Sequence, residues 1–169
     1  MIASSTPLDQ KVAIVKSAFD LMGWKQFAPL VLFVGHGSHS ANNAFGSSLD
    51  CGACAASPGR HNARMLATLA NETDVKQVLR EEHGITIPNS TIFIGCEHNT
   101  TTDEIVLFDS GIPHQYHLQV QNLKLDLTRA QQSATQERLG TGNKRVAIPQ
   151  RKANDERDQS RRPMFSSFL

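Results

Sequence analysis

The sequence lacks a membrane-spanning segment and a secretion signal. No apolar run approaches the roughly 20 residues that a transmembrane helix needs, and the N-terminus has no basic stretch followed by an apolar one. We therefore expect the chain of 169 residues to be soluble and intracellular.

The sequence also lacks a charge imbalance. Lysine and arginine together number 17, against 16 aspartate and glutamate residues, so no strong field favours nucleic acid or an anionic membrane as a partner. Hydrophobic residues make up 39% of the chain, which is enough for one core. We expect one globular α/β domain over residues 1–140, followed by a polar, charge-mixed linker or tail over residues 141–169.

Cysteine is scarce as well. The three cysteines are an odd number, with Cys51 and Cys54 together and Cys96 apart, which is a poor disulfide framework. Reduced thiols that are free to bind a metal are the better interpretation.

Hydrophobic periodicity and turn residues predict alternating strands and helices. Apolar residues at helical spacing predict a first helix that follows Thr6-Pro7 and ends at Gly23. The other predicted helices cover about 62–69, 73–83 and 116–139, and the predicted strands are 30–34, 91–94 and 105–108. In the last helix we expect the inward face to carry Leu118, Leu123, Leu127 and Ala130.

This order predicts a parallel-strand core with flanking helices: a βαβ unit, a third strand and a long C-terminal helix. The first two strands should be parallel neighbours, so that their C-terminal ends lie side by side. Two polar loops should then meet at one sheet edge, from His36 to Cys54 and from Cys96 to Asp103. Such an edge is where α/β domains bind ligands.

His36 and Cys51 are the first candidates for chemistry, because imidazole and thiolate are good zinc ligands. Their spacing alone is weak support. His36 as a capped polar residue in a glycine-rich turn and Cys51 as a small buried apolar residue are the alternatives.

The neighbouring polar residues have open roles. Cys51-Gly-Ala-Cys54 has the spacing of a redox pair or of two zinc ligands, but a redox site would begin a helix directly after its strand. Cys54 is either a ligand or a buried spectator. In the string His98-Asn-Thr-Thr-Thr-Asp103, side chains such as His98, Thr100 and Asp103 could orient ligands or a substrate. A solvated loop is the alternative.

Several strings together resemble the C-terminal part of the DabA family, the inorganic-carbon transporter subunit whose active site is similar to that of β-carbonic anhydrases. The resemblance covers about Leu30 to Leu139, and its most specific strings are Leu-Asp-Cys-Gly-Ala-Cys and His-Asn-Thr-Thr-Thr-Asp. It implies a partial β-carbonic-anhydrase-like domain. It also implies Zn²⁺ held by an upstream Cys-x-Asp pair together with a His and a Cys spaced as His36 and Cys51 are.

The resemblance further implies a function. Zinc in such a site lowers the pKa of a bound water to about 7, and the resulting hydroxide converts CO2 to bicarbonate. The implied partner is a proton-conducting DabB-type membrane subunit, which would hold the chain on the inner face of the cell membrane.

No cysteine in this chain is followed two residues later by aspartate. We therefore expect carbonic-anhydrase-like activity only if that ligand pair is supplied from elsewhere, and we assign no catalytic residue. Two alternatives remain: a non-catalytic interaction module, and a self-contained zinc protein that recruits Cys54, Cys96 or His98.

Overall fold

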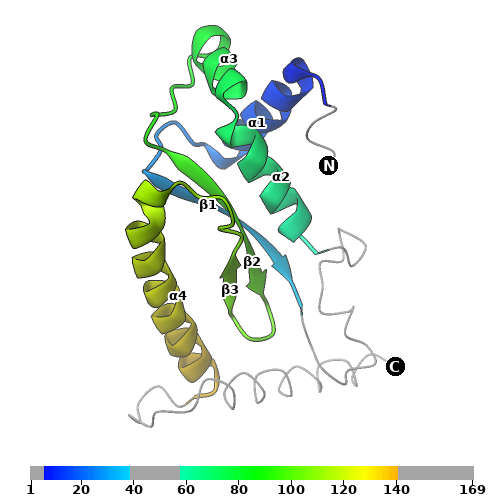
Figure 1. Cartoon of the computed structure of the whole chain (residues 1–169). Helices are drawn as coiled ribbons and strands as arrows, with labels where there is room; N and C mark the ends of the chain where they lie inside the picture. The colour runs from blue at the N-terminus through cyan, green and yellow to red at the C-terminus, as the bar shows by residue number, and fades with distance from the viewer. Residues whose placement is uncertain (1–5, 39–57, 141–169) are drawn as a thin grey trace, which may run out of the picture. The chain divides into compact units, whose positions relative to one another are not determined.

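A computed structural model describes residues 6–38 and 58–140 of the chain (Figure 1). The fold is α/β, as predicted. In chain order, the helices and strands are α1 (Leu8–Met22), β1 (Leu30–Gly37), α2 (Arg60–Asn71), α3 (Thr73–His83), β2 (Ile92–Asn99), β3 (Ile105–Leu107), the short 3-10 helix η3 (His114–Tyr116) and α4 (His117–Arg138). None of the helices in the described ranges combines the length and apolar character needed to cross a membrane.

The three strands form one mixed sheet in the order β1-β2-β3. The Ile92 N–H donates to the Pro29 carbonyl and the Thr100 N–H to the Gly37 carbonyl, an unchanged offset that marks β1 and β2 as parallel. The hydrogen bonds from Asn99 to Glu104 and from Phe108 to Gly95 run antiparallel between β2 and β3. The predicted βαβ unit with a third strand is thus confirmed.

Both parallel strands are longer than predicted. Strand β1 continues through Gly37 and β2 through Asn99, so His36, Cys96 and His98 are strand residues and not loop residues. The prediction stopped where the apolar run stopped. Pairing of the backbone with a neighbouring strand extends each strand into polar sequence, which composition alone does not signal.

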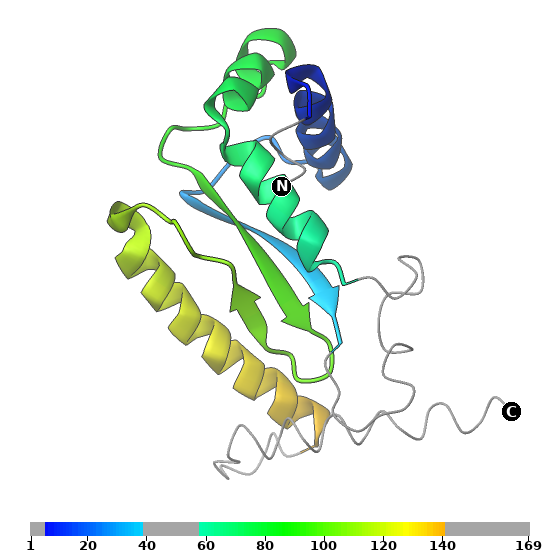
Figure 2. The same ribbon diagram turned by 45° about the vertical axis from the view of Figure 1, so that its right-hand side comes forward.

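The chain divides into two compact units, which we describe separately. The first comprises Met1–Gly35, Gly59–Glu97 and Leu107–Asp109, and the second His36–Pro58, His98–Val106 and Ser110–Leu169. In the first unit, helices α1, α2 and α3 contact one another pairwise, and α2 runs along the β1–β2 strands (Figures 1 and 2).

The core of the first unit is rich in aromatic rings. Phe19 of α1 packs on Phe27 with ring centroids 4.9 Å apart, and Phe33 of β1 stacks on Phe93 of β2 at 5.4 Å. Helix α1 buries Val12, Val15 and Phe19, whereas Leu8 and Met22, at its two ends, are exposed. It ends at Gly23, as predicted, with the left-handed φ of +67° that glycine tolerates at a helix C-terminus.

In the second unit, helix α4 turns a different face inward from the predicted one. Its buried residues are Val120, Gln131 and Thr135, whereas the Leu118 side chain is 68% exposed and Ala130 is exposed too. Leu123 and Leu127, which were also predicted to face inward, are half-buried. The buried stripe follows helical spacing through Gln131, a polar residue that the periodicity of apolar residues does not reveal.

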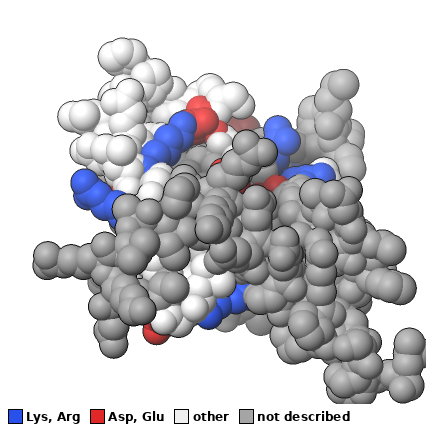
Figure 3. All heavy atoms as spheres, turned by 90° about the horizontal axis from the view of Figure 1, so that it is seen from below, with Lys and Arg blue, Asp and Glu red and all other residues white. Residues whose placement is uncertain are grey.

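Charged side chains on the helices pair with opposite charges. Lys11 of α1 lies 2.7 Å from the Glu72 carboxylate, and Lys16 lies 2.6 Å from Asp20 one turn along the helix. Figure 3 shows described basic and acidic side chains at several separate places between residues that are not described.

Asn71 ties the end of α2 to strand β2. Its amide nitrogen donates to the Phe93 carbonyl at 2.7 Å, and its amide oxygen accepts the Phe93 N–H at 3.0 Å. Strand β3 is only three residues long and pairs with β2 further along, so the Asn71 amide satisfies the backbone groups that a longer strand would pair.

We predict that Asn71→Ala lowers the free energy of unfolding by about 2 kcal/mol, because it leaves two backbone groups of Phe93 without their partner. Urea unfolding followed by circular dichroism measures the change. Asn122→Ala, at an exposed position of α4, is the matched control and should change stability by no more than about 0.5 kcal/mol. Equal effects of the two substitutions would refute this role of Asn71.

Candidate functional site

His36 lies near the C-terminal end of β1, and its side chain is exposed. The carbonyl of the next residue, Gly37, accepts the Thr100 N–H at 2.9 Å and the Thr100 hydroxyl at 3.3 Å. The turn after β2 therefore lies beside the end of β1, as the parallel topology predicted. An exposed imidazole at such an edge is available as a metal ligand.

The turn from Asn99 to Glu104 has a defined conformation. The Asn99 carbonyl accepts the Asp103 N–H at 2.7 Å, and the Asn99 side-chain oxygen accepts the Thr101 N–H at 3.0 Å. Asp103 adopts a φ of +58°, the one positive φ at a described residue other than glycine. Aspartate tolerates this conformation better than most residues, but it is held there by its surroundings.

This turn brings two of the predicted site residues together. The His98 Nε2 lies 3.4 Å from a carboxylate oxygen of Asp103, and both side chains are partly exposed. A carboxylate beside one ring nitrogen orients an imidazole and selects its tautomer. His98, near the end of β2, and Thr100 and Asp103, in the turn that follows, thus lie beside the end of β1.

Close backbone contacts in the first unit hold Gly35 of β1 against Gly59, which precedes α2, and Gly95 of β2 against α2. A Cβ atom added to Gly35 would lie 2.3 Å from the Gly59 carbonyl carbon, and one added to Gly95 would lie 2.7 Å from the Arg64 Cα. Only glycine leaves room for these approaches. Cys51 and Cys54 lie outside the described residues, but the chain before and after them meets at Gly35 and Gly59.

Side chains of α2 reinforce this arrangement. Arg60 forms a 3.1 Å ion pair with the largely buried carboxylate of Glu97 on β2, and the Arg64 guanidinium lies 4.9 Å from the centre of the Phe108 ring. Sequence reasoning missed these contacts. A glycine inside the buried strand Ile92–Asn99 was the one available signal, since it marks a close approach of another backbone.

Cys96 is poorly suited to bind zinc. Its side chain is fully buried, and its Sγ lies 3.7 Å from the Ile94 carbonyl oxygen. Burial, with a smaller contribution from Asp109, raises the pKa of the Cys96 thiol from 9.0 to about 12. Within residues 6–38 and 58–140, no three or more His, Cys, Asp or Glu side chains gather as a metal site. The burial and the raised pKa count against Cys96 as a replacement ligand.

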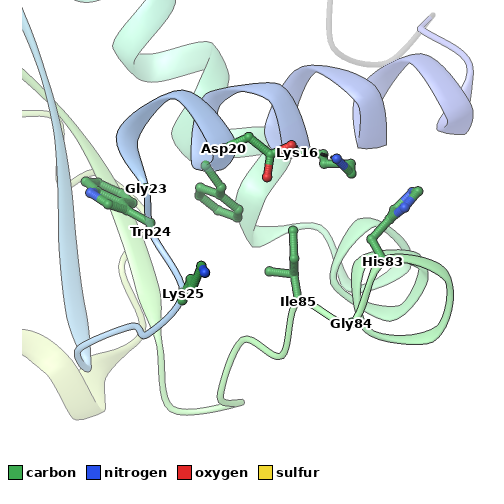
Figure 4. Close-up of a pocket in the computed structure, with 9 residues that line it drawn as sticks. Lys16, Asp20, Gly23, Trp24, Lys25, His83, Gly84 and Ile85 are labelled. Atoms are coloured by element: carbon green, nitrogen blue, oxygen red, sulfur yellow. Dashed lines mark hydrogen bonds and ion pairs between the residues drawn. The ribbon is translucent and has the colours of Figure 1, made fainter.

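A pocket of about 360 Å³ lies elsewhere in the first unit, at the C-terminal ends of α1 and α3 (Figure 4). Lys16 and Asp20 enter from α1, and His83 from α3. None of the predicted site residues lines this pocket.

Comparisons with known proteins agree with one another. The family model described as "Probable inorganic carbon transporter subunit DabA" matches residues 3–163. Curated proteins with that same name are 52% identical in Natronomonas pharaonis, over 77% of this chain and 16% of the relative, and 46% identical in Haloarcula marismortui, over 87% and 19%. A third, from Salinibacter ruber, is 49% identical over 82% of this chain and 17% of its own length. The chain thus spans less than one fifth of these relatives, and no solved structure matches it.

We predict that Cys96 resists alkylation by iodoacetamide at pH 8 in the folded chain and reacts after unfolding in urea, as peptide mass spectrometry can measure.

The stability of the chain should also depend on pH through Cys96. Because folding raises the pKa of the Cys96 thiol to about 12, the thiol of the unfolded state loses its proton at a lower pH than that of the folded state. The contribution of Cys96 to stability should therefore be constant below about pH 9 and should fall between about pH 9 and 12.

The Cys96→Ala variant supplies the baseline for this pH dependence, because it lacks the titrating thiol. The stability difference between the two proteins should shrink as pH rises through this range. Alkylation of folded Cys96 at the rate of the unfolded chain would show that the thiol is accessible.

Proposed function

The chain belongs to the DabA family, and we propose that it supplies His36 and Cys51 as two ligands of a zinc site that hydrates CO2 to bicarbonate for inorganic-carbon uptake. The proposal goes beyond the family's description, which names a probable transporter subunit. It rests on one observation above all: the exposed imidazole of His36 lies next to Gly37, to which the turn that follows His98 and carries Asp103 is hydrogen-bonded.

The chemistry of the donors supports zinc. Imidazole and thiolate are ligands that zinc prefers, and His36 makes no hydrogen bond to another described residue that zinc binding would break. The close contact of Gly35 with Gly59 means that the segment that carries Cys51 starts and finishes near the same strand end. Because both ends of the segment lie near β1, the proposed pair combines His36, at the start of the segment, with Cys51, within it.

His36 and Cys51 would hold the zinc ion, which would supply the Lewis acidity that activates water near neutral pH for attack on CO2. The chain's own residues would do the rest. Asp103 would orient the His98 ring beside the site, and the Thr100 hydroxyl secures the turn on Gly37. We propose Cys54 as a neighbour of the site that contributes packing.

A four-coordinate site needs two further ligands. No cysteine of this chain is followed two residues later by aspartate, so we propose that a Cys-x-Asp pair comes from another segment or another chain. The isolated chain should then be inactive. The self-contained alternative loses support from the burial of Cys96, and the interaction-module alternative predicts that zinc is absent even when the second pair is supplied.

The word "subunit" in the family's description supports a partner. We propose a proton-conducting DabB-type membrane protein, whose coupling would drive hydration in one direction. The chain would then work in the cytoplasm, peripherally on the inner face of the membrane.

We predict that His36→Ala and Cys51→Ala each remove zinc and abolish CO2 hydration in a family protein that joins this chain to a Cys-x-Asp segment. Each substitution deletes a coordination bond, whereas Cys54→Ala deletes packing worth about 1 kcal/mol and should leave zinc in place. Metal analysis and a stopped-flow pH-indicator assay give the two measurements.

The isolated chain is the control and should show no hydration above buffer background. Equal zinc loss in all three variants would make Cys54 a ligand. Unchanged zinc in His36→Ala would refute the site, and chelator-sensitive turnover by the isolated chain would favour the self-contained alternative.

A further inference from the structure

The buried stripe of helix α4 changes character along its length. Near the N-terminus it buries Val120, with Leu123 and Leu127 half-buried beyond it. One turn further along, the buried residues are Gln131 and Thr135. A long polar side chain such as glutamine is rarely buried without a specific partner, because removing an amide from water costs free energy unless its hydrogen bonds are replaced.

One partner of Gln131 is the turn after β2. Its amide nitrogen donates to the Thr102 carbonyl at 3.0 Å, and the Gln131 side chain is almost fully buried. This carbonyl belongs to the peptide group that joins Thr102 to Asp103, whose φ is +58°. Holding the carbonyl fixes the orientation of that peptide plane and therefore favours the left-handed conformation of Asp103.

The neighbouring hydroxyls show that packing alone does not explain Gln131. Thr101 and Thr135 are also buried, and their hydroxyl oxygens have no hydrogen-bond partner. Apolar side chains of similar shape would fill those positions at lower cost. Gln131 differs from them because its amide reaches one particular backbone atom of the turn.

We propose that Gln131 is a positioning residue: through the Thr102 carbonyl, it holds Asp103 in the conformation that places its carboxylate on His98. The role in catalysis rests on the proposed function, whereas the role in shaping the turn does not. The turn should therefore change when the amide is removed, whether or not the chain binds zinc.

Nuclear magnetic resonance of the 169-residue chain tests the structural part. Gln131→Met keeps the length and shape of the side chain but lacks the donor. We expect shifted amide signals from Asn99 to Glu104 and roughly tenfold faster hydrogen exchange of the Asp103 N–H, which donates to Asn99.

Two control variants separate positioning from general loosening. Thr135→Val alters the same buried stripe at a hydroxyl without a partner, and Gln132→Met makes the same substitution at an exposed position. Neither should change the Asp103 exchange rate. If Gln131→Met leaves the turn signals unchanged, or if Thr135→Val changes them equally, the positioning role is wrong.

The catalytic part is tested in the family protein that carries the Cys-x-Asp segment. Gln131→Met should lower the kcat of CO2 hydration and change its pH profile while zinc content stays unchanged. An unaltered kcat and pH profile would overturn the catalytic part. If the unsubstituted protein neither binds zinc nor hydrates CO2, the proposed function itself fails, and the exchange experiment still decides the structural part.

Discussion

The close approach of α2 to the sheet is the constraint on which the described structure depends. Gly35 on β1 and Gly95 on β2 leave no space for a side chain where the backbone of Gly59 and Arg64 comes against them. A methyl group at either position would meet backbone atoms, which move only if the helix moves. The ion pair of Arg60 with Glu97 and the contact of Arg64 with Phe108 follow from this approach.

The same approach has a consequence for function. Gly35, two residues before the end of β1, lies against Gly59, so the chain returns beside β1 after the polar segment 36–58. Closing a long segment costs conformational entropy, which the buried contacts of α2 offset. Such closed segments on rigid strands are where α/β domains place binding residues.

Local signals in the sequence predicted a large part of the fold. The helix from Thr73 to His83 and the helix ends at Gly23 and Gly84 were correct, because a glycine in the left-handed conformation is a strong stop signal. The strand ends were wrong, since β1 and β2 run on into polar sequence where neighbouring strands pair them. The parallel order nevertheless placed the turn that follows His98 beside the end of β1.

The candidate site was predictable only in part. The parallel strand order predicted that the turn after β2 lies beside the end of β1, whereas Gln131 carried no signal because its contact is with Thr102, 29 residues away. Cys51 and Cys54 lie outside the described residues, so their roles stay predictions.

The zinc coordination shell is the most direct test of the account. X-ray absorption at the zinc edge of a family protein with the Cys-x-Asp segment should show two sulfur ligands at about 2.3 Å and two nitrogen or oxygen ligands at about 2.0–2.2 Å, reduced to one sulfur by Cys51→Ser. A shell without sulfur, or one that Cys51→Ser leaves unchanged, would contradict it.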